Sequence, residues 1–484
     1  MSSARLILLS ALTVSACMPR SAVPVTSPIA ARPDSAPVAP TRTPTPTIEF
    51  DTASDTAADR AAAESTAEDL EVTPAAATDR AAPPPDASWD IEVREYLDHH
   101  RVEFYLERFT GSARDRVVSW MQRGIRYEPM IRKTFREAGI AEDFYFLALV
   151  ESGYDPHAYS RAHAVGMWQF IASTGRAVGL RIDWWVDERR DPMAATRAAA
   201  RFLGDLHDRF GSQYLAAAAY NGGPGRVSRG LTRFARAVGD SEGDDQFFAL
   251  AGTRALHAET SNYVPQIIAA AAIGKEPWKY GIKFDSVAPY AYDSVRVGPG
   301  TAVAAVALAA GAPLDSIRDL NPHLLRGTTA PKDSAWVRVP AGHAVSFGSA
   351  FAALPDSARN AWKAVKVTKA TTLAAMARTA GVTEIQVRWY NPTIRSSRVA
   401  AGTVVNVPTK LAVAGAFNVP TPGLTRGMPA ANGVHIVERG QTLSHIANWN
   451  GTTVSRLMSL NGLKKNTIFP GQRIRVRPAP KAGG

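Results

Sequence analysis

Ala148-Leu149-Val150-Glu151-Ser152-Gly153-Tyr154 places a carboxylate at the end of an apolar run and directly before a turn of small residues. The run begins at Phe144 and is typical of a buried helix. Glu151 is therefore expected at the carboxyl end of that helix, where the negative end of the helix dipole and the apolar surround both disfavour a charged carboxylate. We expect its pKa to be raised, so that it can donate a proton near neutral pH. A glutamate that faces solvent at a helix end is the alternative.

Three further strings combine amides, hydroxyls and glycine-rich turns with otherwise apolar segments. They are Gly166-Met167-Trp168-Gln169-Phe170, Ala219-Tyr220-Asn221-Gly222-Gly223-Pro224-Gly225 and Glu259-Thr260-Ser261-Asn262-Tyr263-Val264-Pro265. All of them lie in residues 89–280, where apolar residues recur at three- and four-residue spacing, as in residues 116–139, 142–152 and 192–210. This part of the chain is predicted to be all-helical.

Beyond residue 286 the chain repeats itself at a constant offset of 70 residues. The offset aligns asparagines and glycines, namely Asn321, Asn391 and Asn461, and Gly311, Gly381 and Gly451. Each copy is predicted to form a strand, two short helices around the glycine, and a second strand. The expected strands are residues 294–297 and 336–339, 364–367 and 404–407, and 434–437 and 473–476.

Together the four polar strings resemble the catalytic domain of family 1 lytic transglycosylases, which is related to goose-type lysozyme. The third repeat, from His435 to Gln472, resembles the LysM family, which binds glycans that contain N-acetylglucosamine. The resemblance implies a multidomain protein with an all-α lysozyme-like catalytic domain at residues 89–285. Three small α+β modules of the βααβ LysM type follow at residues 286–345, 362–410 and 433–478. The first two are degenerate in the Gly-x-Thr-Leu turn, so a spacer role without glycan binding is their alternative.

The same resemblance implies an enzyme that cleaves the β-1,4 bond between N-acetylmuramic acid and N-acetylglucosamine in peptidoglycan and leaves a 1,6-anhydromuramic acid end. Glu151 would be its one catalytic acid and base, and Tyr263 would lie within hydrogen-bonding reach of it. Ser152, Gln169, Tyr220 and Asn221 would bind substrate together with Tyr263. In the third module, glycan would be bound by Gly440, Thr442, Leu443, Asn461 and Gly462. No cofactor and no metal site are expected.

Two alternatives remain open for the activity. Ordinary glycosidases use two carboxylates, and Asp155, four residues after Glu151, is the candidate second carboxylate for a muramidase that uses water. Asp155 also stands before Pro156, where a turn residue is common. The other alternative is a peptidoglycan-binding scaffold without catalysis. Trp184-Trp185 and Arg189-Arg190 offer stacking and charge beside the glycan, or instead core packing and a solvated face.

The N-terminal residues have the pattern of a secreted lipoprotein. Residues 1–16 form a basic and then apolar stretch typical of a signal peptide, and Val14-Ser15-Ala16-Cys17 resembles a bacterial lipobox. Cys17 is the only cysteine of the 484 residues. A plain signal peptide with a stray cysteine is the alternative. Because Met18, and not aspartate, follows the cysteine, we expect a lipid anchor in the outer membrane, on its periplasmic side.

Residues 17–88 are rich in alanine, proline and threonine and are predicted to be a disordered linker. They and the signal peptide carry six arginines against eleven acidic residues, so the net charge of +11 arises entirely from the rest of the chain. A strongly basic folded part favours an anionic partner such as peptidoglycan. No nucleic-acid-binding pattern is present, and the sequence leaves the oligomeric state open.

Overall fold

The computed structural model describes most of the chain after residue 88. The described residues are 89–160, 162–394, 396–417, 433–437, 443, 446–447, 452–463, 467–469 and 472–476. The signal peptide, the lipidation residue Cys17 and the linker therefore lie outside the described residues. No helix of the described part is long and apolar enough to cross a membrane.

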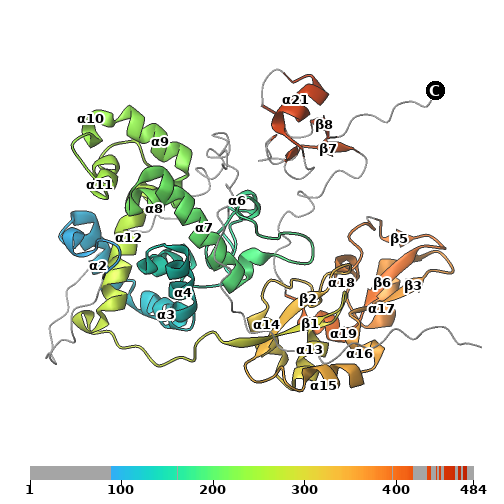
Figure 1. Cartoon of the computed structure of the whole chain (residues 1–484). Helices are drawn as coiled ribbons and strands as arrows, with labels where there is room; N and C mark the ends of the chain where they lie inside the picture. The colour runs from blue at the N-terminus through green and yellow to red at the C-terminus, as the bar shows by residue number, and fades with distance from the viewer. Residues whose placement is uncertain are drawn as a thin grey trace, which may run out of the picture.

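Residues 94–280 form a helical domain, which confirms the all-α prediction (Figure 1). Its elements are η1 (Arg94–Tyr96), α2 (His100–Thr110), α3 (Arg114–Ile125), α4 (Glu128–Ala138), η2 (Glu142–Phe144), α5 (Tyr145–Ser152), α6 (Ala172–Ala177), η3 (Glu188–Arg190), α7 (Pro192–Phe210), α8 (Gln213–Gly222), α9 (Pro224–Arg233), α10 (Ala235–Val238), α11 (Asp245–Ala251), α12 (Ala258–Lys275) and η4 (Pro277–Tyr280).

The helix boundaries follow local signals, with one difference from the sequence prediction. Residues 116–139 form parts of two helices, α3 and α4, rather than one. Pro129 stands in the first turn of α4, where its missing N–H costs nothing, whereas inside a continuous helix it would remove a hydrogen bond and clash with the preceding turn. α7 has the predicted bounds, because Asp191 caps its start and Gly211 ends it in the left-handed conformation.

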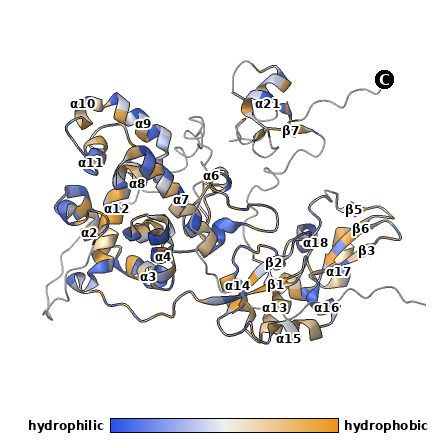
Figure 2. Cartoon of the chain, in the orientation of Figure 1, coloured by the Kyte–Doolittle hydropathy of each residue, from blue (hydrophilic) through white to orange (hydrophobic). Residues whose placement is uncertain are grey.

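The core of the helical domain forms around α12, whose residues from Tyr263 to Ile273 are mostly buried. α12 packs against α2, α5 and α8 and is coloured largely as hydrophobic in Figure 2. A side chain at Gly274 would overlap the ring of Phe146 on α5, so α5 and α12 approach closely at this point. The central helix therefore fixes the position of the short helix that carries Glu151.

The modules after residue 290 consist of antiparallel strand pairs with helices between them, as predicted. The first contains β1 (Tyr292–Val297), α13 (Val303–Ala310), α14 (Leu314–Leu320) and β2 (Ala335–Pro340). The second contains β3 (Trp362–Lys366), β4 (Thr371–Thr372), α17 (Leu373–Ala380), α18 (Glu384–Trp389), β5 (Arg398–Val399) and β6 (Val404–Pro408). In the third, β7 (Val434–Ile436), α21 (Val454–Asn461) and β8 (Arg473–Arg475) are described.

Three helices outside the repeat pattern join these modules. They are α15 (Phe347–Ala353), α16 (Asp356–Arg359) and α19 (Lys410–Gly415). Phe347 is buried in the same core as Val303 and Val339 of the first module. Ala412 of α19 is buried with Ala305 and Tyr390, so the first and second modules share apolar contacts.

The repeated asparagine has the same structural role in each module. The side-chain amide of Asn321 donates to the carbonyls of Ile317 and Arg338, and its oxygen accepts the Arg338 backbone N–H. Asn391 makes the same three bonds with Val387 and Asn406, and Asn461 makes them with Leu457 and Arg475. The asparagine thus ties the end of the second helix to the last strand.

The first two modules dock onto the helical domain through its segment 183–191. Val186 is buried in the core of the first module and bridges to Leu324. Trp185 stacks on Trp362 of the second module, and Trp184 Nε1 donates to the carbonyl of Trp389 at 2.5 Å. The two tryptophans therefore pack in an interface between domains, rather than offering stacking surfaces for a glycan.

Arg326 lies at the centre of this interface. Its guanidinium group is 4.6 Å from the ring centroid of Trp184 and 5.2 Å from that of Trp389. The side chain is fully buried, none of its three nitrogens has a hydrogen-bond partner in the described part of the chain, and burial lowers its pKa to about 10. The two indole faces are its electrostatic partners.

Candidate active site

Glu151 lies in the last turn of α5, as predicted. Gly153 ends this helix in the left-handed conformation, with φ 60°, and a side chain there would overlap Trp120. Protein surrounds the Glu151 carboxyl group, although a small part of the residue remains exposed. Burial raises its pKa to about 8, so the carboxyl group is mostly protonated at neutral pH.

Tyr263 of α12 donates a hydrogen bond from its hydroxyl to Oε1 of Glu151. Burial and the nearby carboxylate raise the pKa of Tyr263 well above its ordinary value, so the phenol keeps its proton. The bond favours the ionised form of Glu151 and therefore lowers its pKa, against the larger effect of burial. The contact that the sequence predicted between these two residues is present.

Glu259 is a second carboxylate whose charge acts on Glu151, and it was not among the predicted site residues. Its negative charge adds to the rise in the Glu151 pKa. It stands four residues before Tyr263 on α12, so the two side chains share one face of the helix. That spacing was the signal that could have found it.

Asn221 connects Glu259 to the end of α8. Its Nδ2 donates to Glu259 Oε1 at 3.2 Å, and its Oδ1 accepts from the Thr260 hydroxyl at 2.8 Å. A Cβ at Gly222 would stand 2.6 Å from that same hydroxyl, so only glycine lets α8 and α12 approach this closely. The predicted residue Asn221 is therefore held beside Glu259.

Ser152 holds the chain that leaves α5. Its hydroxyl donates to the carbonyl of Met167 at 2.8 Å and accepts the backbone N–H of Asp155 at 3.1 Å. Asp155 in turn accepts the His157 N–H at 2.8 Å. Asp155 is thus a turn residue, which is the role favoured by the proline after it.

Gln169 and Tyr220 meet at the segment 166–170. Gln169 has a φ of 47°, which is uncommon for a residue other than glycine, and its Nε2 donates to the carbonyl of Gly166 at 2.8 Å. The Tyr220 hydroxyl donates to the carbonyl of Trp168 at 2.8 Å. Among the described residues, the Gln169 side-chain oxygen accepts no hydrogen bond, so it is the free polar atom of this group.

Arg189 and Arg190 lie against the segment 166–170. Both are buried, which rules out the solvated face that the sequence left open. Arg189 pairs with Asp187 at 2.8 Å and donates to the carbonyl of Phe170 at 3.1 Å. A Cβ at Gly166 would lie 1.9 Å from the Arg189 carbonyl oxygen. These arginines shape the backbone around Gln169 rather than carrying surface charge.

The predicted glycan-binding residues of the third module divide into three groups. Leu443 is buried in the module core, and Asn461 makes its three bonds to backbone groups. Both side chains stabilise the module. Gly462 is exposed after α21 in the left-handed conformation. Gly440 and Thr442 lie outside the described residues.

A largely protonated carboxylic acid at the end of a short helix, hydrogen-bonded to a tyrosine, fits the general acid of a glycan-cleaving enzyme with a lysozyme-like helical domain. Comparison with known families agrees with this class. The Transglycosylase SLT domain matches residues 129–238, the LysM-like domain of lytic transglycosylase MltD matches residues 291–356, and the LysM domain matches residues 435–477. The helical domain and the modules of this chain are therefore similar to those of lytic transglycosylases.

Two individual relatives agree with these matches. The chain is 28% identical to membrane-bound lytic murein transglycosylase D of Escherichia coli strain K12 over 368 residues, which cover 72% of this chain and 76% of that protein. It is 38% identical over 104 residues to peptidoglycan transglycosylase gp16 of Escherichia phage T7, covering 21% of this chain and 8% of that one. A solved lytic transglycosylase Slt from Pseudomonas aeruginosa overlaps 31% of this chain and 24% of its own at 23% identity, with a TM-score of 0.25.

Proposed function

We propose that this protein is a peptidoglycan lytic transglycosylase that cleaves the β-1,4 bond between N-acetylmuramic acid and N-acetylglucosamine and leaves a 1,6-anhydromuramic acid end. The observation that carries the proposal is Glu151, a buried carboxyl group with a pKa of about 8 that accepts a hydrogen bond from Tyr263. Such a group can donate a proton to a glycosidic oxygen at neutral pH.

In the proposed reaction Glu151 acts twice. It first protonates the leaving oxygen of N-acetylglucosamine as the bond to C1 of the muramic acid breaks, with the substrate's own N-acetyl group stabilising the positive charge at C1. The resulting carboxylate then takes the proton of the C6 hydroxyl, whose oxygen closes on C1. The proton that Glu151 gives to the leaving oxygen is replaced by the proton of the C6 hydroxyl, and an electron pair of the C6 oxygen forms the new bond to C1. Glu151 therefore ends the cycle protonated. The Tyr263 hydrogen bond stabilises the carboxylate that exists between the two steps.

The neighbouring residues are proposed to position the sugar. Asn221 and the free side-chain oxygen of Gln169 would contact the glycan directly. Ser152 and Tyr220 would act through the backbone of segment 166–170, because their hydroxyls bond to the carbonyls of Met167 and Trp168. Placing the substrate in one geometry before reaction is a large part of the rate advantage available to a single-acid enzyme.

We also propose that the third module binds the glycan and that a lipid on Cys17 anchors the chain to the outer membrane, on the periplasmic side. The LysM match supports the first proposal, with the exposed Gly462 and the residues Gly440 and Thr442 as the candidate contacts. The lipobox-like residues 14–17 support the second, as does the description of the Escherichia coli relative as membrane-bound. Tethering would raise the concentration of the enzyme near its insoluble substrate.

Product analysis tests the activity. Purified peptidoglycan treated with the protein is expected to release muropeptides that end in anhydromuramic acid, each lighter by one water than the reducing form, as read by mass spectrometry. Reducing ends would instead mean that water is the nucleophile and that the protein is a muramidase. If no soluble product forms, the remaining alternative is a peptidoglycan-binding scaffold without catalysis.

Tyr263→Phe is expected to change the pH profile as well as the rate. The hydroxyl lowers the pKa of Glu151, so its loss raises that pKa further above 8. Because the first step needs the protonated acid, the alkaline limb of kcat/KM should move to higher pH, while kcat falls about tenfold as the intermediate carboxylate loses a charged hydrogen bond. Tyr105→Phe on α2 is the matched control. An unmoved alkaline limb would contradict this role for Tyr263.

A further inference from the structure

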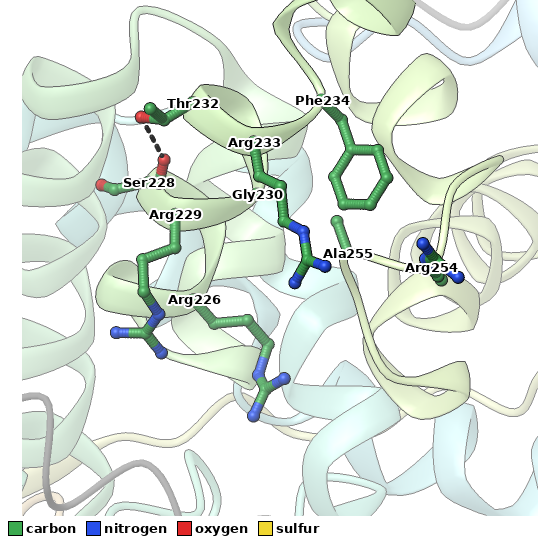
Figure 3. Close-up of a pocket in the computed structure, with 9 residues that line it drawn as sticks. All are labelled: Arg226, Ser228, Arg229, Gly230, Thr232, Arg233, Phe234, Arg254 and Ala255. Atoms are coloured by element: carbon green, nitrogen blue, oxygen red, sulfur yellow. Dashed lines mark hydrogen bonds between the residues drawn. The ribbon is translucent and has the colours of Figure 1, made fainter.

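A hollow of about 610 Å³ lies between α9 and the segment before α12, outside the group of residues around Glu151. Figure 3 shows the nine residues that line it, four of them arginines and none of them acidic. Arg226, Arg229 and Arg233 come from α9, and Arg254 faces them from the other wall. The proposed activity assigns no role to these residues.

The spacing of the arginines makes them one group. Arg226, Arg229 and Arg233 stand three and four residues apart, so they project from the same side of α9. From α7, Arg209 Nη2 donates to the hydroxyl of the lining residue Ser228 at 2.8 Å, which brings a fifth guanidinium group to the same wall. A group of guanidinium cations in one hollow favours an anionic ligand. Planar guanidinium groups match carboxylates and phosphates in pairs of hydrogen bonds.

The two segments that form the walls of the hollow are connected along the chain to Asn221 and Glu259, which belong to the site around Glu151. α9 begins two residues after Gly222, and Arg226 follows Asn221 by five residues. On the other wall, Arg254 precedes Glu259 by five residues. The bond between Asn221 and Glu259 therefore joins the two walls at the end nearest to the catalytic acid. The hollow therefore begins within two helical turns of Asn221, a residue proposed to contact the glycan.

We propose that this arginine-lined hollow binds the carboxylates of the peptide stem carried by the muramic acid at the cleavage point. The inference rests on the proposed function. α9 has 10 residues and is about 15 Å long at 1.5 Å rise per residue. Four extended stem residues span about 13 Å, so the stem can run along the three α9 arginines. The protein would thus prefer glycan with peptide stems over glycan from which the stems have been removed.

A binding measurement tests this separately from catalysis. The full-length protein with Glu151→Gln, which keeps the substrate intact, is titrated against two fluorescent glycan probes of equal length, one with tetrapeptide stems and one without. Stems should tighten binding about tenfold. The pair Arg233→Gln with Arg254→Gln should remove most of that advantage and leave binding of the stem-free probe within about twofold, since charged hydrogen bonds of this kind are worth about a factor of ten.

The control is Arg108→Gln with Arg236→Gln, which removes the same charge from two exposed arginines outside the hollow. It should keep the tenfold preference. Equal binding of both probes by the parent protein, or equal weakening of both by the Arg233 and Arg254 pair, would overturn the proposal.

Competition separates stems from phosphate headgroups as the anion. Free tetrapeptide should displace the stem-bearing probe, and glycerol phosphate should not. The reverse result would assign the hollow to a headgroup and overturn the proposal. A failure of the proposed activity would appear in a different experiment, as the absence of anhydro products with the unsubstituted enzyme. The binding result could still be interpreted in that case.

Discussion

Glu151→Gln is expected to lower the rate of anhydromuropeptide formation by about a thousandfold or more. Glutamine keeps the size and polarity of the side chain but can neither give nor take the proton, and a positioned acid or base contributes roughly 10²–10⁴-fold in each step that uses it. The measurement is the initial rate of product release from purified peptidoglycan, followed by mass spectrometry. A variant that kept more than a tenth of the rate would show that Glu151 is not the acid.

A stability measurement tests whether loss of folding, and not loss of the acid, lowers the rate. The pH dependence of that stability has a predicted direction. The pKa of Glu151 is about 8 in the folded chain against an ordinary value of 4.5. Its contribution to folding is therefore fully present below pH 4.5 and is lost as the pH rises through 8. Glu151→Gln should accordingly be at least as stable as the parent protein at pH 8.5, and relatively less so at pH 4.5, in urea unfolding. Glu137→Gln, an exposed site on α4, should change neither rate nor stability.

Asp191→Ala is expected to destabilise the chain by about 3–5 kcal/mol. The Asp191 carboxylate caps α7 by accepting the backbone N–H groups of Met193 and Ala194. It also accepts two hydrogen bonds from Arg338 of the first module, at 2.7 and 2.9 Å. Removing one partner of a buried ion pair leaves the other charge buried and unpaired, and loss of a helix cap adds about 1 kcal/mol.

The same residue gives a pH dependence of the opposite sign to that of Glu151. Burial alone would raise the Asp191 pKa, but the charge of Arg338 and the helix-cap bonds hold it well below the usual range. Its contribution is present above the ordinary pKa of 3.8 and is lost as the pH falls through the folded value. His323, whose Nδ1 is 3.2 Å from Asp191, adds little near neutral pH because burial lowers its own pKa to about 4.

Urea unfolding followed by tryptophan fluorescence measures this effect, since Trp184, Trp185 and Trp389 lie in the interface that Asp191 helps to close. In the variant, undocking of the modules should precede unfolding of the helical domain. Asp315→Ala is the control, because its ion pair with Arg318 is exposed and such pairs are worth about 0–1 kcal/mol. A loss of less than 1 kcal/mol in Asp191→Ala would mean that the interface does not depend on this pair.

The sequence predicted those parts of the fold and site that local pattern controls. The bounds of α7 and the position of Glu151 at the end of α5 follow from caps, glycines and apolar spacing within about 20 residues. The strand pairs of the modules follow from the repeat at a constant offset of 70 residues. Where the prediction was wrong, at residues 116–139, the missing signal was also local, namely Pro129 at the start of α4.

Other side chains could not be interpreted from spacing alone. Arg189 and Arg190 read as candidates for surface charge, yet their carbonyl partners come from segments 19 to 33 residues earlier in the chain. Asn461 read as a glycan contact, but the strand that satisfies its amide begins 12 residues later. Spacing places Glu259 on one helix face with Tyr263, but its contact with Asn221 exists only because α8 and α12 meet there.

The sequence by itself determined that a carboxylic acid would end an apolar helix, that an all-helical domain would precede three related modules, and which family the motifs resemble. These depend on short-range periodicity and on motifs read in order. The tertiary structure alone decided how far burial raises the Glu151 pKa, that the charge of Glu259 would act on it, and that Asp191 would pair with Arg338 across 147 residues. Burial and pairing at such separations depend on how helices pack, and a pKa is set by that packing and not by the neighbours of a residue in the chain.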